Sequence, residues 1–372
     1  MTRRLNIRLA IIAVILAALG TREILLEHHF SWLRPGQHMR AFVANRVDGT
    51  VSVLDLVRLA PVATIAVGPD PSAIQRRPGT REIWGLSGPG GYLWEIDGET
   101  ERVTAKIFVG LQPSSLEFSS DGRMVYVTLA GENQLAVIDA NAHSVVARLS
   151  AGHMPEIVRA SAGGDFLLVA NRGDATLTIF DARTQAVRAT VSVVPDPDKI
   201  AVLPDDSKAF VASGTSPLLS VVNLRLNELV SNLSLGGRAS DLFLKPDGGE
   251  LYVPSPEAHG LLFVNTSTNE VADYMLLGLG PQTGMLLPDG RLIVADTSGG
   301  RIVPVTPDDR LALPSEPVGE GPVAVALTPG GEMWIIVDRD SNDVAVLRGV
   351  DGKMITIIPT GRTPVGIAIL LF

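Results

Sequence analysis

The sequence has no cysteine among its 372 residues. This absence excludes a disulfide framework, a thiolate zinc site, an iron–sulfur cluster and a CxxCH haem attachment. Aromatic residues make up only 5% of the chain, so its core must be built mainly from Val, Ile, Leu and Ala. Basic residues are outnumbered, with 31 Lys and Arg against 40 Asp and Glu, and the net charge of -9 argues against a nucleic-acid partner.

Long apolar runs are scarce, and the one at the N-terminus is short. Residues 9–20 are apolar or small and follow Arg3, Arg4 and Arg8. Twelve helical residues reach only about 18 Å, less than the ~30 Å hydrocarbon core of a bilayer. We therefore expect residues 1–20 to be an export signal, with Ala18 and Gly20 at a small-x-small cleavage site, and residues 21–39 to be a linker. An uncleaved membrane anchor and a cytosolic helix are the alternatives.

Turn residues are abundant, with 37 Gly and 25 Pro, and they recur at a fixed spacing. The segments "VGLQPSSLEFSSDG" (109–122) and "AGHMPEIVRASAGG" (151–164) share a Gly, a Pro three residues later, an apolar run and a turn. Aligning the chain on that Gly gives eight anchor positions, with steps of 42 residues except for one step of 41: Gly68, Gly110, Gly152, Val194, Gly236, Gly278, Gly319 and Gly361.

Each period contains four short strand patterns separated by turns, which is typical of a β-propeller blade. We therefore predict an all-β fold in which residues 40–372 form eight blades of four antiparallel strands. The chain starts at Arg40 with strands two to four of one blade and ends at Phe372 with strand one of the same blade, so this shared blade should close the ring. Asp55, Asp97, Asp139 and Asp181 recur at one blade position and are predicted to be structural turn residues.

The phrases "AFVANRVDGTVSVLDL" (41–56), "MVYVTLAGENQLAVIDANAHSVVARLSAG" (124–152) and "LLVANRGDATLTIFDARTQAV" (167–187) resemble the YVTN family of β-propeller repeat proteins. The resemblance covers residues 40–372 and implies a protein of the periplasm or cell envelope. It also implies a fold similar to the haem d1 domain of cytochrome cd1 nitrite reductases. The chain departs from the repeat at residues 84–97 and 252–265, where we expect the least regular blades.

Function in a propeller is expected on the loops that gather at one face around the axis. Three equivalent loops carry a basic and an acidic residue: Arg46 and Asp48, Arg172 and Asp174, Arg339 and Asp340. They predict a charged rim for a polar or anionic ligand, together with Arg238 and Arg362 from the connections between blades. Simple turn chemistry with solvated arginines is the alternative interpretation.

Histidine offers two candidate ligand-binding residues. His153, in "AGHMP", is the best single candidate for a metal or haem ligand, and His259 could be a second, although it lies three blades away. A hydrogen-bonded loop residue is the alternative for each. We expect no metal and no cofactor.

Three consecutive innermost strands carry polar residues seven positions after the anchor, namely Gln75, Glu117 and Arg159. If these strands line the central channel, Glu117 and Arg159 should form a partly buried ion pair between neighbouring blades. The pair could orient a ligand or simply plug the channel.

The chain has no supported nucleophile elbow, zinc-protease, P-loop or dinucleotide motif. With only Trp32, Trp84, Trp94 and Trp334, it also lacks the repeated Trp docking motif of eight-bladed quinoprotein dehydrogenases. We therefore expect an exported, membrane-associated propeller that binds an envelope or membrane protein partner or a small ligand and has no catalytic residues. A haem d1-like or metal-binding redox accessory protein is one alternative, and a lyase or lactone hydrolase is another.

Overall fold

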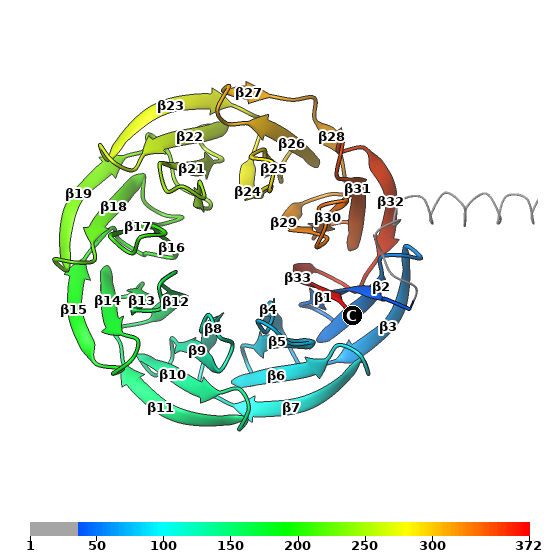
Figure 1. Ribbon diagram of the computed structural model, residues 1–372, viewed down its shortest axis with the longest axis horizontal. Coiled ribbons are helices and arrows are strands. Elements are labelled where there is room, and N and C mark those ends of the chain that lie inside the picture. Colours follow the sequence, from blue (N-terminus) through cyan, green and yellow to red (C-terminus); the bar gives the residue numbers. More distant parts are fainter. Residues whose placement is uncertain (1–35) are drawn as a thin grey trace, which may run out of the picture.

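The computed structural model describes residues 36–372, and every regular element in this range is a β-strand. The strands form eight sheets around a central axis, which confirms the predicted eight-bladed propeller (Figure 1). We number the blades by the repeat, so that blades 1 to 7 follow one another from residue 71 and blade 8 contains both ends of the described chain. The predicted export signal and most of the predicted linker lie outside the described residues. No helix in residues 36–372 is long and apolar enough to cross a membrane.

The innermost strand of each blade follows an anchor position and faces the channel (Figure 1). In the order of blades 1 to 8, these strands are β4 (Pro71–Arg76), β8 (Pro113–Phe118), β12 (Pro155–Ala160), β16 (Lys199–Val202), β20 (Phe243–Leu244), β24 (Pro281–Leu286), β29 (Pro322–Leu327) and β33 (Pro364–Leu371).

The second and third strands are the most apolar and are buried on both faces, because each packs between two neighbouring blades. The second strands are β5 (Glu82–Ser87), β9 (Met124–Leu129), β13 (Phe166–Asn171), β17 (Lys208–Ala212), β21 (Glu250–Ser255), β25 (Leu292–Asp296), β30 (Met333–Asp338) and β1 (Met39–Asn45). The third strands are β6 (Tyr92–Asp97), β10 (Gln134–Asp139), β14 (Thr176–Asp181), β18 (Leu218–Asn223), β22 (Gly260–Asn265), β26 (Arg301–Thr306), β31 (Asp343–Arg348) and β2 (Thr50–Asp55).

The outermost strands lie at the circumference and alternate between exposed and half-buried residues, as in β11. They are β7 (Arg102–Phe108), β11 (Ser144–Ser150), β15 (Val187–Ser192), β19 (Glu228–Ser234), β23 (Glu270–Leu276), β27 (Leu311–Ala312) with β28 (Glu316–Pro317), β32 (Met354–Pro359) and β3 (Ala60–Ala66). The core lies between blades: one cluster packs Trp84 and Leu86 of blade 1 against Val125 and Val127 of blade 2.

The shared blade closes the ring as predicted. β33 pairs antiparallel with β1, and Val43 lies opposite Ile367 in the register. Beyond the strands, His38 and Phe372 exchange two backbone hydrogen bonds. This pairing removes the two free sheet edges that an open ring would expose.

One backbone hydrogen bond recurs around the loop face, by which we mean the face that carries the loops between strands two and three and the connections between blades. An N–H from the connection donates to a carbonyl of the second-to-third strand loop of the preceding blade, as Val67 does to Gly49 and Ala151 does to Asn133. The accepting residue often has a positive φ, including Gly49 (65°), Asn133 (55°) and His259 (57°). The backbone of this face is therefore fixed by the repeat itself.

The anchor glycine is needed for two different reasons. Gly68 has φ 119°, which other residues rarely adopt. At Gly361 the reason is space, because a Cβ there would lie 2.7 Å from the amide group of Asn45.

The acidic residues that end the third strands are turn residues, as predicted. Asp55 and Asp139 each accept backbone N–H bonds from the residues two and three positions later. Those bonds, first the one from Ala142, lower the pKa of Asp139.

Of the two blades expected to be irregular, only one is. Blade 1 contains residues 84–97 and has four full strands, so that prediction was wrong; Gly85 there lets Trp94 pack against the sheet. Blade 5 contains residues 252–265, and its innermost strand β20 has two residues. Irregularity also occurs in blade 6, where the step of 41 residues coincides with an outer strand divided into β27 and β28.

Candidate functional site

The charged residues of the loop face mostly bind one another across blades. Arg46 pairs with Asp70 of the next blade at 2.8 Å, and Arg172 pairs with the equivalent Asp196 at 3.7 Å. Both arginines are about half exposed, so these contacts contribute little stability. The sequence pairs Arg46/Asp48 and Arg172/Asp174 are therefore not ion pairs within their own loops, whereas Arg339 and Asp340 do pair, at 2.8 Å.

The acidic residues of these loops hold the connections between blades. Asp48 accepts the backbone N–H of Arg362 at 2.7 Å and its side-chain Nε at 2.6 Å. Asp174 accepts the backbone N–H of His153 in the same way. Glu257 accepts the N–H of Arg238 and also pairs with its guanidinium. The backbone bond from Arg362 is the main cause that lowers the pKa of Asp48. These contacts favour the turn-chemistry interpretation of the rim.

The two candidate histidines lie on the rim. His153 is exposed and covers Gly173, where a Cβ would lie 2.1 Å from its Nδ1 atom. The Nδ1 atom of His259 is 3.1 Å from the carbonyl oxygen of Leu279. Within residues 36–372, no group of three His, Asp or Glu side chains is arranged to hold a metal ion.

The expected ion pair in the channel is present. Arg159 Nη1 of β12 lies 3.4 Å from Glu117 Oε2 of β8, and the two side chains are 40% and 20% exposed. The equivalent positions in blades 4 to 8 are apolar: Ala201, Phe243, Met285, Ala326 and Ala368. The polar residues at this level of the channel are thus confined to three neighbouring blades.

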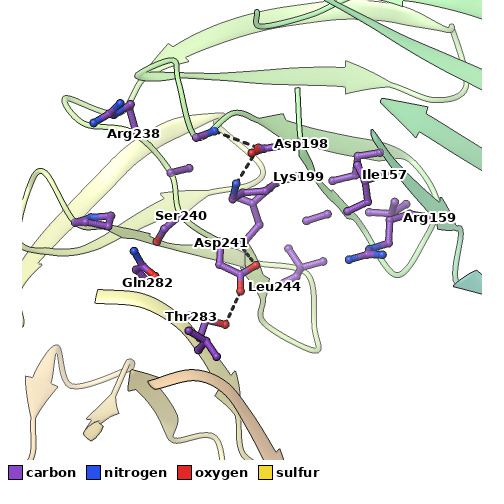
Figure 2. A pocket seen from close by; sticks show the side chains of 18 of the residues that line it. Ile157, Arg159, Asp198, Lys199, Arg238, Ser240, Asp241, Leu244, Gln282 and Thr283 are labelled. Atoms are coloured by element: carbon purple, nitrogen blue, oxygen red, sulfur yellow. Dashed lines mark hydrogen bonds and ion pairs between the residues drawn. The ribbon is translucent and has the colours of Figure 1, made fainter. Parts of the chain in front are cut away.

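Beside this pair, a cavity of about 930 Å³ occupies the part of the channel bounded by β12, β16, β20 and β24. Figure 2 shows Ile157 and Arg159 on one side of it and Gln282 and Thr283 on the other. Its lining includes Lys199, Asp198, Asp241 and, at the rim, Arg238 with Glu257. A volume of this size suits an organic ligand. We call it the channel cavity.

Lys199 and Asp198 form a pair on β16 and the residue before it. Lys199 Nζ donates to Asp198 Oδ1 at 2.8 Å, and the same oxygen accepts the backbone N–H of Gly214 at 3.1 Å. Figure 2 shows both bonds at the wall of the cavity. The pair therefore fixes an ammonium group at the cavity wall.

Asp241 lines the cavity at the repeat position that Lys199 and Thr283 occupy in the neighbouring blades, and it lies two residues before the short strand β20. Its carboxyl accepts the hydroxyl of Thr283 and the backbone N–H of Leu242, both at 2.8 Å. Burial raises the pKa of Asp241, and the bond from Thr283 only partly offsets this. A carboxyl with a raised pKa, near Lys199, can hold or release a proton inside the cavity.

A second cavity of about 450 Å³ adjoins the first and shares Ile157, Arg159 and Asp198 with it. Its other polar lining residues are Gln75, Ser114, Ser115, Glu117 and Glu156. Burial raises the pKa of Glu117 and of Glu156. All three predicted channel residues therefore line a cavity, and Arg159 lies between the two.

Sequence reasoning missed Asp198, Lys199 and Asp241 because it considered only the seventh position after the anchor. The signal lies at the fourth and fifth positions of the same alignment. The fourth position reads Ser72, Ser114, Glu156, Asp198, Ser240, Gln282, Val323 and Val365, and it becomes apolar only in blades 7 and 8. An aligned comparison of every inner-strand position would have shown which blades present polar residues to the channel.

The fold and this site define an eight-bladed β-propeller with a ligand-sized cavity on one side of its channel. The family model described as "Lactonase, 7-bladed beta-propeller" matches residues 20–204, somewhat less than half of the chain. The present ring has eight blades rather than the seven of that description. A search of curated proteins found no match.

Among solved structures, the chain is similar to dihydro-heme d1 dehydrogenase NirN in complex with DHE, with 18% identity and a TM-score of 0.75 over 88% of this chain and 74% of that one. It is also similar to Citrobacter koseri AztD, with 13% identity and a TM-score of 0.68 over 90% of this chain and 98% of that one. Kuenenia stuttgartiensis hydrazine synthase matches with 18% identity and a TM-score of 0.60, over 76% and 96% of the two chains. These identities support a common fold, and the predicted similarity to haem d1 propellers is confirmed at that level.

Proposed function

We propose that the protein is a binding propeller that holds a small organic ligand in the channel cavity. One observation carries this proposal: from the fourth to the seventh position after the anchor, the chain carries polar side chains in blades 1 to 6 and only apolar residues in blades 7 and 8, although the repeat makes all eight blades geometrically equivalent. A ring needs the same packing in every blade, so a local departure toward Arg159, Lys199 and Asp241 has no structural requirement behind it. Buried charged groups are costly to keep and are typical of functional sites.

The repeat supplies a matched test of this proposal. Ala201 lines the channel cavity, and the equivalent residue in blade 5 is Phe243. The variant Ala201→Phe should therefore fit the fold but fill the cavity, whereas Ala326→Phe makes the same change on blade 7, outside its lining. Native mass spectrometry of the full chain should detect a bound small molecule in the wild type and in Ala326→Phe, and not in Ala201→Phe. Equal retention by both variants would contradict the proposal.

A second candidate function is hydrolysis of a lactone. It is supported by the family description and by the closeness of a carboxyl with a raised pKa, Asp241, to the ammonium of Lys199. The ionised carboxyl could activate water, and the ammonium could stabilise the developing oxyanion. A pH-stat assay with glucono-δ-lactone tests this: the protein should release acid faster than buffer alone, and Asp241→Asn should lose that excess. A wild-type rate equal to buffer would remove the candidate.

Export to the periplasm or cell envelope is part of the proposal and is supported by the sequence of residues 1–20. Mass spectrometry of the protein recovered from an envelope fraction should show a mature N-terminus near Thr21. An intact Met1 in that fraction would instead indicate an uncleaved anchor. The predicted envelope or membrane protein partner stays a prediction.

A further inference from the structure

The charges of the channel cavity do not balance locally, and the imbalance centres on Arg159. Three cations line the cavity. Lys199 is paired with Asp198, and Arg238 with Glu257, so two of them are neutralised by carboxylates of the same cavity. The carboxylate partner of Arg159 is Glu117, which lines the second cavity and not the first.

The remaining carboxyl of the channel cavity does not compensate Arg159. Asp241 already accepts bonds from Thr283 and Leu242, and burial raises its pKa, which favours the uncharged form. Burial also raises the pKa of Glu117, the ion-pair partner of Arg159, which disfavours the ionised form of that carboxyl. Among the described residues, no carboxylate of the channel cavity lies within ion-pair distance of the guanidinium, whose ion pair is with Glu117.

Arg159 also has free hydrogen-bonding capacity. Within residues 36–372, its hydrogen bonds leave only from Nη1, one to Glu117 at 3.4 Å and one to the carbonyl of Val158 at 3.2 Å. The Nε and Nη2 groups form the edge of a guanidinium that can bind a carboxylate through two parallel bonds. Figure 2 shows this side chain at the wall of the cavity, next to Ile157.

The rest of the lining suits a hydrocarbon body. Aliphatic residues of β12, β16 and β20 also line the cavity: Ile157, Ile200, Val202 and Leu244. A ligand with an apolar body and one anionic end would match these walls and the unpaired guanidinium together.

We propose that the ligand of the channel cavity is an amphipathic organic acid, whose carboxylate binds the free Nε/Nη2 edge of Arg159 and whose hydrocarbon body packs on the aliphatic side chains of β12, β16 and β20. This inference rests on the proposed function and names the chemical class of its ligand. Glu117 binds Nη1 and the ligand binds the Nε/Nη2 edge, so Arg159 has one partner in the empty channel and a second when the ligand is bound. The charge of Glu117 repels the carboxylate of the ligand.

Three probes of equal length test the ligand class: octanoate, octylammonium and octan-1-ol. Isothermal titration calorimetry on the purified full chain should show binding of octanoate at least about tenfold tighter than binding of either control, because only octanoate complements the guanidinium. Octylammonium or octan-1-ol binding as tightly as octanoate would overturn the inference. Absence of octanoate binding would also overturn it, and if native mass spectrometry still found a different bound molecule, the proposed function would stand.

Two variants separate an anchoring role of Arg159 from a structural one. Arg159→Gln should weaken octanoate binding about tenfold, whereas Glu117→Gln should strengthen it about threefold because it removes a negative charge beside the guanidinium. If the pair only stabilised the channel, both variants would weaken binding. Arg225→Gln, an exposed arginine 3.8 Å from Asp205, is the matched control and should leave binding unchanged.

The melting temperature of each variant shows whether it is folded. If Arg159→Gln does not fold, Arg159→Lys takes its place, because it keeps the charge and loses the edge that makes two parallel bonds. It should bind octanoate more weakly than the wild type but still measurably above the buffer blank. Wild-type affinity in Arg159→Lys or Arg159→Gln, or weaker binding in Glu117→Gln, would refute the assignment of Arg159.

Discussion

Replacing Asp338 with Asn should stabilise the protein at neutral pH. Asp338 is 0% exposed at the end of β30, and it lies directly opposite Asp343 across the hairpin to β31. Its Oδ2 atom accepts the N–H of Gly319 at 3.1 Å, whereas its buried Oδ1 atom has no partner within the described residues. Burial is the main cause that raises the pKa of Asp338 to about 8, and the neighbouring Asp343 adds to the shift.

The repeat shows what this position ordinarily contains. In blades 8 and 3 the same two places are Asn45 with Thr50 and Asn171 with Thr176, and the amide nitrogen donates to the threonine hydroxyl in both. A protonated Asp338 can donate to Asp343 in the same way, but only while it keeps its proton. An asparagine would donate at every pH.

The sign and the magnitude follow from the two pKa values. With a pKa of about 8 when folded against 3.8 when unfolded, the folded protein binds the extra proton between these pH values. Its stabilising effect is complete below pH 3.8 and is lost as the pH rises toward 8. At about 1.4 kcal/mol for each pH unit, the upper limit of the loss at pH 7 is about 4 kcal/mol, and relaxation around the pair should reduce it to about 2 kcal/mol.

The assay is urea unfolding of wild type and Asp338→Asn from pH 5 to pH 8. The variant should have a free energy of unfolding higher by about 1 to 3 kcal/mol at pH 7 and a flatter dependence on pH. Asp296→Asn is the matched control with the opposite sign, because Asp296 Oδ2 binds Arg301 Nε at 2.9 Å and the substitution leaves a partly buried cation unpaired. A less stable Asp338→Asn at pH 7, or an unchanged pH slope, would refute the reasoning.

Three further predictions concern packing and closure. Deleting residues 364–372 removes β33 and should lower the free energy of unfolding by more than about 5 kcal/mol, measured by urea titration, whereas a truncated protein of wild-type stability would show that the ring does not depend on β33. Gly85→Ala should destabilise by about 2 to 3 kcal/mol, because the new Cβ would lie 2.2 Å from Trp94 Cζ2 and 2.4 Å from the carbonyl oxygen of Ala73; an unchanged melting temperature would contradict this. Arg46→Gln should change stability by less than about 0.5 kcal/mol, since its pair with Asp70 is half exposed, and a larger loss by the same titration would mean that the rim pairs stabilise the ring.

The sequence was sufficient to predict the ring because each blade repeats one packing unit. The nearly constant step between the eight anchors predicted the number of blades. The positions of Arg40 and Phe372 within the repeat predicted the shared blade. The same repeat predicted the contact between Glu117 and Arg159, because equivalent residues of adjacent inner strands are neighbours.

The site was harder to predict, since it depends on departures from the repeat. Asp241 lines the cavity at the same repeat position as Lys199 and Thr283, and only a comparison of this position across the blades indicates that polar residues gather there. The rim residues recur with the repeat: Arg46, Asp48, Arg172 and Asp174 all contact the connections between blades, and their predicted role in ligand binding stays a prediction. Charged residues that recur at equivalent positions of many blades are expected to stabilise the fold. Charged residues that occur in only a few neighbouring blades are a better indicator of a binding site.

The pairing of β1 with β33 joins the first strand of the propeller to its last, so the ring stays open until β33 has been synthesised. Until β33 has been synthesised, β1 is paired on one side only, with β2, and its other edge is exposed in every incomplete product, which favours aggregation. The seam also puts the two ends within reach of each other. A short tether between residues 36 and 372, with new ends cut in an exposed loop elsewhere, should give a rearranged chain that assembles into the same circle.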